Sequence, residues 1–412
     1  MIQFESFKLA NGLEVHVIPD PSTELAVVNI LYKVGSRDEE EHKTGFAHLF
    51  EHLMFGGSKH IPSYDEPLQL VGGENNAFTS PDITNYYITL PAANIETAFW
   101  LESDRMLSLS FDPKVLEVQQ KVVIEEFKQR YLNQPYGDIW LKLRPLAYKQ
   151  HSYKWATIGK EISHIENATM SDVQDFFFKY YRPNNAVLVV AGKVTTEQVQ
   201  KLAEKWFGPI PAGDVPARRL RAEPKQHDAR ILNVQSKVPL SALYKTFHMS
   251  GRAADNYQSI DFLGDILGRG KSSRLYNVLV KEKKIFNSIQ SYVLGSIDPG
   301  LLMIDGKLNE GHTFDEAEKA IDEVLAEIKT KKINDDELIK VKNKALSSLV
   351  FSEVELLNQA MNVAFMSFLG DPNWVNKETD KIESVTTDNI LDEANNILTN
   401  ANSSTLYYEA IK

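Results

Sequence analysis

Two hydrophobic periods follow one another at the start of the chain. Apolar and polar positions alternate in "LEVHVIPD", and a longer β-rich run, "ELAVVNILYKVG", comes after it, which predicts two strands. The Asn11-Gly12 pair ahead of the first run is typical of a tight turn. Between Thr44 and Phe55 the apolar positions take a helical period, and Gly56-Gly57 is a suitable end for that helix. The chain is therefore predicted to open as strands followed by a helix.

The same kinds of pattern continue through the first half of the chain. "NYYITLP" predicts another strand, and helical periods follow near residues 93–108 and 112–131. "NNAVLVVAGKV" is an apolar run typical of a buried strand. The next segment, "FGPIPAGDVPARRLRAEPKQHD", is rich in proline, glycine and arginine and has no period. We interpret residues 209–230 as a linker between domains.

The second half of the chain repeats the first faintly. "LYKVGSRDEEE" has an echo in "LYKTFHMSGRAAD", and "DPKVLEVQQK" has one in "DDELIKVKNK". These echoes predict a duplicated α+β unit, with one domain over residues 1–208 and a second over residues 231–412. Chance resemblance between short helical patterns is the alternative explanation.

Length, charge and cysteine content narrow the possible functions. A chain of 412 residues is too long for one ordinary core, which agrees with two domains. The net charge of -11 argues against binding nucleic acid or an anionic membrane through bulk charge. Because the chain has no cysteine, any metal site would use histidine and carboxylate ligands. No signal-peptide or membrane-spanning pattern is found, so we expect a cytoplasmic protein, or a periplasmic one if a leader has been removed.

One apolar helix carries three groups that are costly to bury. Within "TGFAHLFEHLMFGGS", His48 and His52 are four residues apart and share one face of the predicted helix, with Glu51 beside them. Two imidazoles at this spacing can grip one ion, and the order H-x-x-E-H is the inverzincin zinc signature. A single buried histidine is more often a hydrogen-bonded core residue, but three such groups left unpaired would cost several kcal/mol. The motif therefore predicts one zinc ion per chain.

A catalytic zinc needs a third protein ligand, and "FDPKVLEVQQKVVIEEFKQRY" offers two adjacent glutamates. At about 100° per residue, the apolar residues of this helix form one arc, made of Leu116, Val123, Phe127 and Tyr131 and widened by Val115 and Val122. Glu126 falls inside this arc, whereas Glu125 points the other way, alongside lysines. An inward glutamate needs a partner and an outward one is solvated, so Glu126 is predicted to be the third ligand.

With these residues the chain resembles the pitrilysin family of inverzincin metallopeptidases over nearly its whole length. "GFAHLFEHLMFGGS" resembles the family's zinc helix, and "VVIEEF" resembles the helix of its third ligand, where Glu126 matches the distal glutamate. The resemblance implies an α+β chain of two tandem homologous α/β-sandwich domains. Each would be a mostly antiparallel sheet packed with helices, and together they would form half of a clam-like chamber. It also implies a zinc-dependent endopeptidase for short or unfolded peptides, with Glu51 as the general base.

The resemblance extends to a surface for the substrate. "GGENNAFTSPDITNYYITLP" resembles the edge strand on which this family docks the substrate backbone as an added strand. The residues that would hold the peptide are Asn76, Ala77, Phe78 and Thr79. Without the zinc motif, an ordinary sheet strand would be the simpler interpretation.

Two departures from the family pattern bear on activity. The family often has a second glutamate seven residues before the distal ligand, and here that position is Gln119, which should face the site but cannot ionise. Family members that act alone also carry an Arg–Tyr pair in the second domain, seven positions apart. The matching positions here hold other residues, namely Leu279 or Val280 for the arginine and Phe286 or Asn287 for the tyrosine. We therefore expect the zinc-bearing subunit of a heterodimer, whose homologous partner lacks the zinc motif and supplies the Arg–Tyr pair.

Two alternatives to the heterodimer stay open. A self-sufficient homodimer could grip its substrate through other residues, such as Arg274 or Lys281. The chain could instead be a zinc-stabilised scaffold or assembly subunit with weak or no turnover, because both departures alter the active site. Cleavage of an unstructured peptide with and without a chelator would separate an enzyme from a scaffold.

Overall fold

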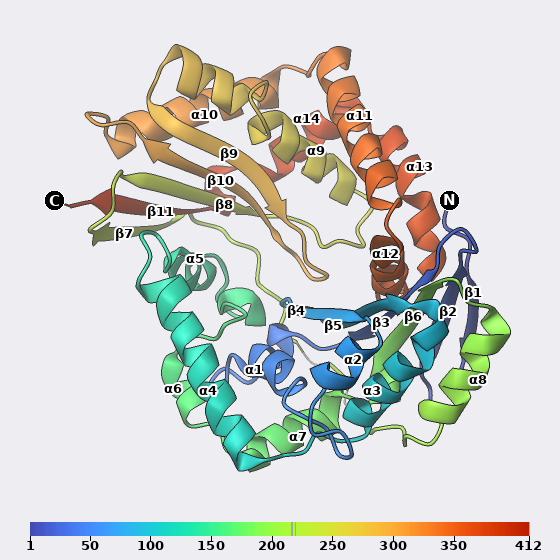
Figure 1. Cartoon of the computed structure of the whole chain (residues 1–412). Coiled ribbons are helices and arrows are strands. Elements are labelled where there is room, and N and C mark those ends of the chain that lie inside the picture. The colour runs from blue at the N-terminus through green and yellow to red at the C-terminus, as the bar shows by residue number, and fades with distance from the viewer. Residues whose placement is uncertain (216, 219, 412) are drawn as a thin grey trace. The chain divides into compact units, whose positions relative to one another are not determined.

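The computed structural model describes residues 1–215, 217–218 and 220–411, and packing divides the chain into two compact units (Figure 1). The first unit consists of Met1–Gln129, Trp155–Leu220 and Leu349–Lys377, and the second consists of Arg130–Lys154, Arg221–Ser348 and Glu378–Lys412. Each unit thus takes a segment from the opposite half of the chain. The linker at 209–230, whose positions 216 and 219 lie outside the described residues, stays a prediction.

The first unit is built on a six-stranded sheet in the order β1-β2-β6-β3-β5-β4. Its strands are β1 (Glu5–Lys8), β2 (Glu14–Pro19), β3 (Leu25–Tyr32), β4 (Glu74–Thr79), β5 (Thr84–Pro91) and β6 (Ala186–Gly192). Only β2 and β6 pair in parallel among these strands. Every residue of β6 is buried, as expected for a central strand that is covered on both faces. The strand β4 pairs with β5 and forms one edge of the sheet.

Helices from both halves of the chain belong to the first unit. They are α1 (Phe46–Leu53), α2 (Asp65–Leu70), α3 (Ile95–Leu107), α4 (Pro113–Phe127), α6 (Ile162–Glu166), α7 (Met170–Tyr180), α8 (Thr196–Trp206) and α12 (Leu356–Leu369). The helix α12 packs on β3 and β6, where Ala360, Val363 and Ala364 join a buried cluster with strand residues such as Val187 and Val189. One face of this sheet is therefore covered by a helix from the second half of the chain.

The second unit has a five-stranded sheet in the order β7-β11-β8-β10-β9. Its strands are β7 (Arg230–Ser236), β8 (Ala242–His248), β9 (Phe286–Leu294), β10 (Leu301–Leu308) and β11 (Ser403–Ala410). Its helices are α5 (Ile139–Ala147), α9 (Tyr257–Gly268), α10 (Phe314–Thr330), most of α11 (Asp335–Ser352), α13 (Glu378–Ser384) and α14 (Thr387–Ile397). The helix α5, which comes from the first half of the chain, packs on β7, β8 and β11.

The two sheets repeat one topology. In the first unit β2 pairs in parallel with β6, and antiparallel pairing then continues through β3 and β5 to the edge strand β4. In the second unit β7 pairs in parallel with β11, and antiparallel pairing continues through β8 and β10 to the edge strand β9. Each edge strand is preceded in the chain by a helix, α1 before β4 and α9 before β9. The predicted fold class of two homologous α/β units is therefore confirmed.

The predicted elements of the first half fall close to the observed ones. The strands β2, β3 and β6 and the helices α1, α3 and α4 lie within the segments that the sequence pattern indicated, and β5 begins one residue before its predicted segment. The helix predicted for residues 112–131 is α-helical only as far as Phe127, and a π-helical turn, Lys128–Leu132, follows it. None of the helices among the described residues is both long enough and apolar enough to cross a membrane.

Candidate metal centre

A buried glutamate anchors the helix that carries the H-x-x-E-H sequence. Gly45 precedes α1 with φ at +86°, a left-handed conformation that favours glycine, and a side chain there would collide with the carbonyl oxygen of Ile158. The carboxylate of Glu39 accepts hydrogen bonds from the N–H groups of Gly45 and Ala47 at 2.9 and 2.8 Å. Burial raises the pKa of Glu39, and these two N–H donors oppose that shift. The first turn of α1 is thereby held in place.

The two faces of α1 have different roles. Its apolar residues Phe46, Ala47, Leu49, Phe50 and Leu53 are buried in the first unit. The side chains of His48 and His52 stay partly accessible, with exposed fractions of 13% and 24%, on the face that meets α4. One face of α1 is therefore packed in the core of the unit, and the other presents the two imidazoles toward α4.

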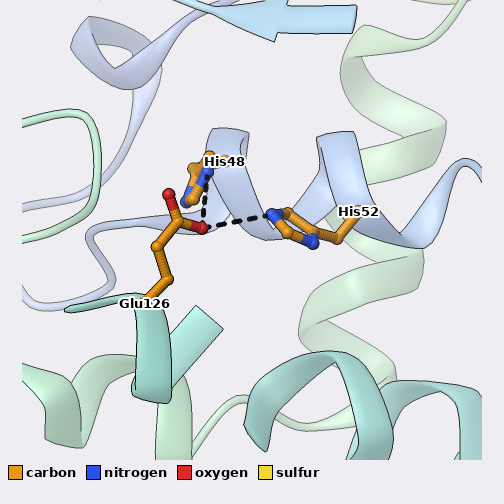
Figure 2. A group of neighbouring side chains, drawn as sticks. All are labelled: His48, His52 and Glu126. Carbon is orange, nitrogen blue, oxygen red and sulfur yellow. Dashed lines mark ion pairs between the residues drawn. The ribbon is translucent and has the colours of Figure 1, made fainter. Parts of the chain in front are cut away.

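Three side chains from two helices converge on one point (Figure 2). The Nε2 atoms of His48 and His52 each lie 3.6 Å from Oε2 of Glu126, which projects from the end of α4. The two imidazole rings stand almost perpendicular to each other, with centroids 4.9 Å apart. The three ligand atoms all lie within 4.8 Å of one another, and among the described residues this is the group of histidine and carboxylate side chains that could hold a metal ion.

The separations between each imidazole nitrogen and the Glu126 carboxylate fit a tetrahedral zinc ion. A direct hydrogen bond would bring nitrogen and oxygen to about 2.7–3.2 Å, so separations of 3.6 Å are too long for one. Zinc bonds of about 2.0–2.2 Å in tetrahedral geometry place neighbouring ligand atoms about 3.3–3.6 Å apart. Two imidazoles and one carboxylate also form a donor set that is used by catalytic zinc, which keeps its fourth position for water. Histidine and glutamate at this point can therefore hold zinc as three ligands.

The two adjacent glutamates of α4 point in different directions, as the helical period predicts. Glu125 is 60% exposed and pairs with Lys128 at 2.7 Å, whereas Glu126 is 19% exposed and faces the histidines. Leu116, Val123 and Phe127 are buried, in agreement with the predicted apolar arc. The inclusion of Val122 in that arc is wrong, because its side chain is 44% exposed. Its direction lies at the margin of the arc.

Glu51 lies between the two histidines in sequence and contacts a different element. Its Oε2 accepts a hydrogen bond from the hydroxyl of Thr79, at the end of β4, with a separation of 2.5 Å. Burial raises the pKa of Tyr86 and of Tyr181, and the negative charge of Glu51 contributes to both shifts. The carboxylate of Glu51 therefore stands among β4, β5 and a buried pair of tyrosines.

The strand predicted to hold the substrate is an edge strand. Asn76, Ala77 and Phe78 lie in the middle of β4, and Phe78 is 39% exposed. The N–H of Ala77 donates to Oδ1 of Asn76 at 2.8 Å, so this N–H points away from β5 toward the open edge. Within the six-stranded sheet β4 pairs only with β5, and an added strand at its other edge would have to replace the contact between Asn76 and the N–H of Ala77.

The structure brings Gln119 to the same helix as Glu126, seven residues earlier and half-buried. The next residue, Gln120, was not singled out from the sequence. Its amide donates to the carbonyl oxygens of Ile165 and Ala168 at 2.8 and 3.0 Å, which ties α4 to the segment around α6. Glu39 was missed in the same way. The local pattern indicates neither residue. Gln120 bonds to a segment that is distant in sequence, and Glu39 bonds across a turn to the start of α1.

Known families match most of the chain. Residues 14–152 match the family model "Insulinase (Peptidase family M16)", and residues 167–345 match "Peptidase M16 inactive domain". The first range contains the three convergent ligands and Glu51, and the second contains α9, which has no such motif.

Several bacterial and mitochondrial proteins are similar to this chain. It is 32% identical to "Zinc protease PqqE" of Helicobacter pylori over 345 residues, which are 82% of this chain and 77% of that protein. It is 30% identical to "Mitochondrial-processing peptidase subunit beta" of Saccharomyces cerevisiae over 212 residues, 51% of this chain and 45% of that protein. The crystal structure of a protease from Helicobacter pylori superimposes with a TM-score of 0.93 at 29% identity, covering 99% of this chain and 100% of that one.

Proposed function

The chain belongs to peptidase family M16, and we propose that it is a zinc-dependent endopeptidase that cuts short or unfolded peptides. The observation that carries this proposal is the convergence of His48, His52 and Glu126 at separations that suit zinc. Relatives that are named zinc proteases support it.

Zinc binding, proton transfer and peptide docking are assigned to different residues in this proposal. His48, His52 and Glu126 would hold the zinc, which supplies Lewis-acid activation of the attacking water and of the scissile carbonyl. Glu51 would take the proton from that water and then pass it to the leaving amine. The backbone of β4, at Asn76, Ala77 and Phe78, would pair with the peptide and hold it in an extended form beside the base.

The role of Glu51 can be tested by replacing it with glutamine. Glu51→Gln should lower cleavage of a quenched, unstructured peptide by about 100- to 10,000-fold, which is the contribution of a general base. Zinc measured by metal analysis should stay near one per chain, because Glu51 is not a ligand in this assignment. Glu125→Gln is the matched control, since Glu125 is exposed and pairs with Lys128, and it should cleave the peptide at the wild-type rate.

Two results would change these assignments. Loss of zinc from the Glu51→Gln variant would make Glu51 a ligand instead of the base. A wild-type chain that holds zinc yet cuts no peptide, even with a partner chain, would support the scaffold alternative, which the match of the second half to an "inactive domain" keeps open.

We also propose that the chain works as the zinc-bearing subunit of a heterodimer. The second unit repeats the topology of the first, and "DFLGDILGRG", which begins in α9, corresponds to "HLFEHLMFGG", which begins in α1. Asp261, Gly264 and Asp265 then stand opposite His48, Glu51 and His52. A homodimer would therefore have two zinc sites and no Arg–Tyr pair. The related mitochondrial peptidase is itself named as a subunit, which supports pairing with a second homologous chain.

The two residues proposed to replace the missing pair in a homodimer have partners within the second unit. Arg274 forms a two-pronged hydrogen bond with Glu337, from Nε at 3.0 Å and from Nη2 at 2.8 Å. This carboxylate raises the pKa of Arg274, so the contact favours the charged pair. Lys281 donates to Asn277 at 3.1 Å. The Arg274–Glu337 pair argues against a homodimer that grips its substrate through Arg274, whereas the local contact of the exposed Lys281 does not distinguish the two oligomers.

The oligomer can be tested with the purified chain. The zinc-loaded chain alone should cut the quenched peptide slowly, because an unclamped peptide loses much of the benefit of positioning. Adding a homologous chain of similar length without H-x-x-E-H, from the same organism, should raise turnover. Full activity of the chain alone, unchanged by that addition, would refute the heterodimer.

A further inference from the structure

We infer that Thr79 is a positioning residue for Glu51: its hydroxyl fixes the orientation of the carboxylate, and its backbone belongs to the strand proposed to dock the peptide. This inference deepens the proposed function and rests on it. It also changes the role expected for Thr79, because its side chain would orient Glu51 and only its backbone would bind the peptide.

The hydrogen bond between the two side chains is short. The separation of 2.5 Å between Oγ1 of Thr79 and Oε2 of Glu51 is at the short end of the range for a hydroxyl that donates to a carboxylate, about 2.5–2.7 Å. Hydrogen bonds to a charged group contribute more stability than those between neutral groups. A carboxylate has about four lone-pair positions, so accepting this bond is compatible with accepting a proton from water.

The alternation of β4 aims the hydroxyl at the helix. Asn75, Ala77 and Thr79 form the half-buried side of the strand, whereas Glu74, Asn76 and Phe78 alternate with them on the exposed side. The helix α1 packs against this strand. Threonine is branched at Cβ, which limits its χ1 rotamers, so the strand delivers the hydroxyl in a defined direction.

Glu51 needs such a restraint because its side chain is long. A glutamate side chain has several rotatable bonds, so holding it in one orientation costs rotamer entropy. The buried side chains of Tyr86 and Tyr181, whose pKa values respond to the charge of Glu51, lie nearby. A misplacement of about 1 Å can cost 100-fold in rate, so a hydroxyl that holds the base affects turnover directly.

The same residue links the base to the docking strand. Thr79 pairs with Thr84 of β5 and is the last residue of β4, so its position depends on the register of this strand. A peptide that pairs with the open edge of β4 would order the strand and, through Thr79, the carboxylate. Substrate docking and orientation of the base are thereby coupled within one short segment.

The test removes the hydroxyl and keeps the shape of the side chain. Thr79→Val should lower kcat for the quenched peptide by about 10- to 100-fold, while KM stays within about twofold, because the backbone that docks the peptide is unchanged. Thr79→Ser restores a hydroxyl and should recover most of the rate. Thr89→Val on the neighbouring strand β5 is the matched control and should leave kcat and KM unchanged.

A crystal structure of the zinc-loaded Thr79→Val chain gives a second readout that does not depend on activity. Glu51 should leave the position that it has in the wild-type chain, while His48, His52 and Glu126 still hold zinc. If Thr79→Val fails to bind zinc or to fold, Thr79→Ala takes its place in both measurements.

The outcomes separate this inference from the proposed function. Wild-type kcat in the Thr79→Val chain, a rise in KM alone, or an unmoved Glu51 would each overturn the positioning role and leave the peptidase intact. A zinc-loaded wild-type chain that cuts no peptide, even with a partner chain, would refute the peptidase, and the orientation of Glu51 in the two crystal structures would still decide the role of Thr79.

Discussion

Replacing the two adjacent glutamates of α4 one at a time tests the metal centre most directly. Glu126 is 19% exposed and its Oε2 lies 3.6 Å from both histidine nitrogens, whereas Glu125 is 60% exposed and pairs with Lys128. Glutamine has nearly the shape of glutamate but no negative charge. The two variants therefore carry the same chemical change, and only one of them places it at the proposed zinc.

The expected magnitudes follow from these positions. Groups that only support a metal ligand cost about 10- to 100-fold in affinity when they are removed. Glu126→Gln changes a ligand itself, so zinc affinity should fall more than about 100-fold, which is about 2.8 kcal/mol or more at about 1.4 kcal/mol per tenfold change. Glu125→Gln removes an exposed ion pair of about 0.2–1 kcal/mol and should leave zinc affinity unchanged.

Zinc affinity can be measured by competition with a chelator of known strength, and the stoichiometry by metal analysis. Thermal unfolding with excess zinc and with chelator gives an independent measure, because zinc at 100 times its Kd stabilises the folded chain by about 2.7 kcal/mol. The wild type and Glu125→Gln should show equal stabilisation, and Glu126→Gln should show little. Equal losses in both variants would mean that the orientation of α4 is wrong. Unchanged affinity in Glu126→Gln would remove Glu126 from the metal centre.

Three further predictions concern stability. Burial lowers the pKa of His16 to about 4, below its ordinary value near 6.5, so the folded chain binds this proton less readily than the unfolded chain. The free energy of unfolding measured with urea should therefore be highest above pH 6.5 and should fall as the pH drops toward 4. His16→Gln should flatten this pH dependence. Glu102→Gln leaves the fully buried guanidinium of Arg105 without its charged partner, so the free energy of unfolding in the same assay should fall by about 3–5 kcal/mol. A fall of less than about 1 kcal/mol would contradict a buried ion pair. A chain that ends at residue 348 lacks α12, which covers one face of β3 and β6, and also β11, which lies between β7 and β8. It should aggregate and fail to bind zinc, and a soluble, zinc-loaded fragment would show that the first unit needs neither element.

Local periodicity was enough to predict much of the metal centre. A period of about 3.6 residues per turn puts His48 and His52 on one face of their helix and turns Glu126 and Glu125 in different directions. In the structure the two histidines and Glu126 lie together, and Glu125 points away. The same reasoning failed for Val122, which is 44% exposed. Periodicity states the direction of a side chain, but the elements that cover that direction are not local.

Contacts between distant segments could not be predicted in this way. The hydrogen bond from Thr79 to Glu51 joins a strand to a helix, and the local sequence of neither element predicts this contact. The capping of α1 by Glu39 and the anchoring of α4 by Gln120 are of the same kind. Each depends on a separation that is set only when the segments pack.

The sequence by itself determined the elements, the duplicated α+β unit and the residues that could bind zinc, because these depend on period, composition and short spacings. Only the tertiary structure decided which half of the chain covers each sheet. The helix α12 packs on β3 and β6 of the first unit, and α5 packs on β7, β8 and β11 of the second, although each comes from the opposite half. An amphipathic helix shows from its sequence that one face must be buried, but any apolar sheet can bury it, and the choice rests on chain connectivity and on the fit of side chains in the folded units.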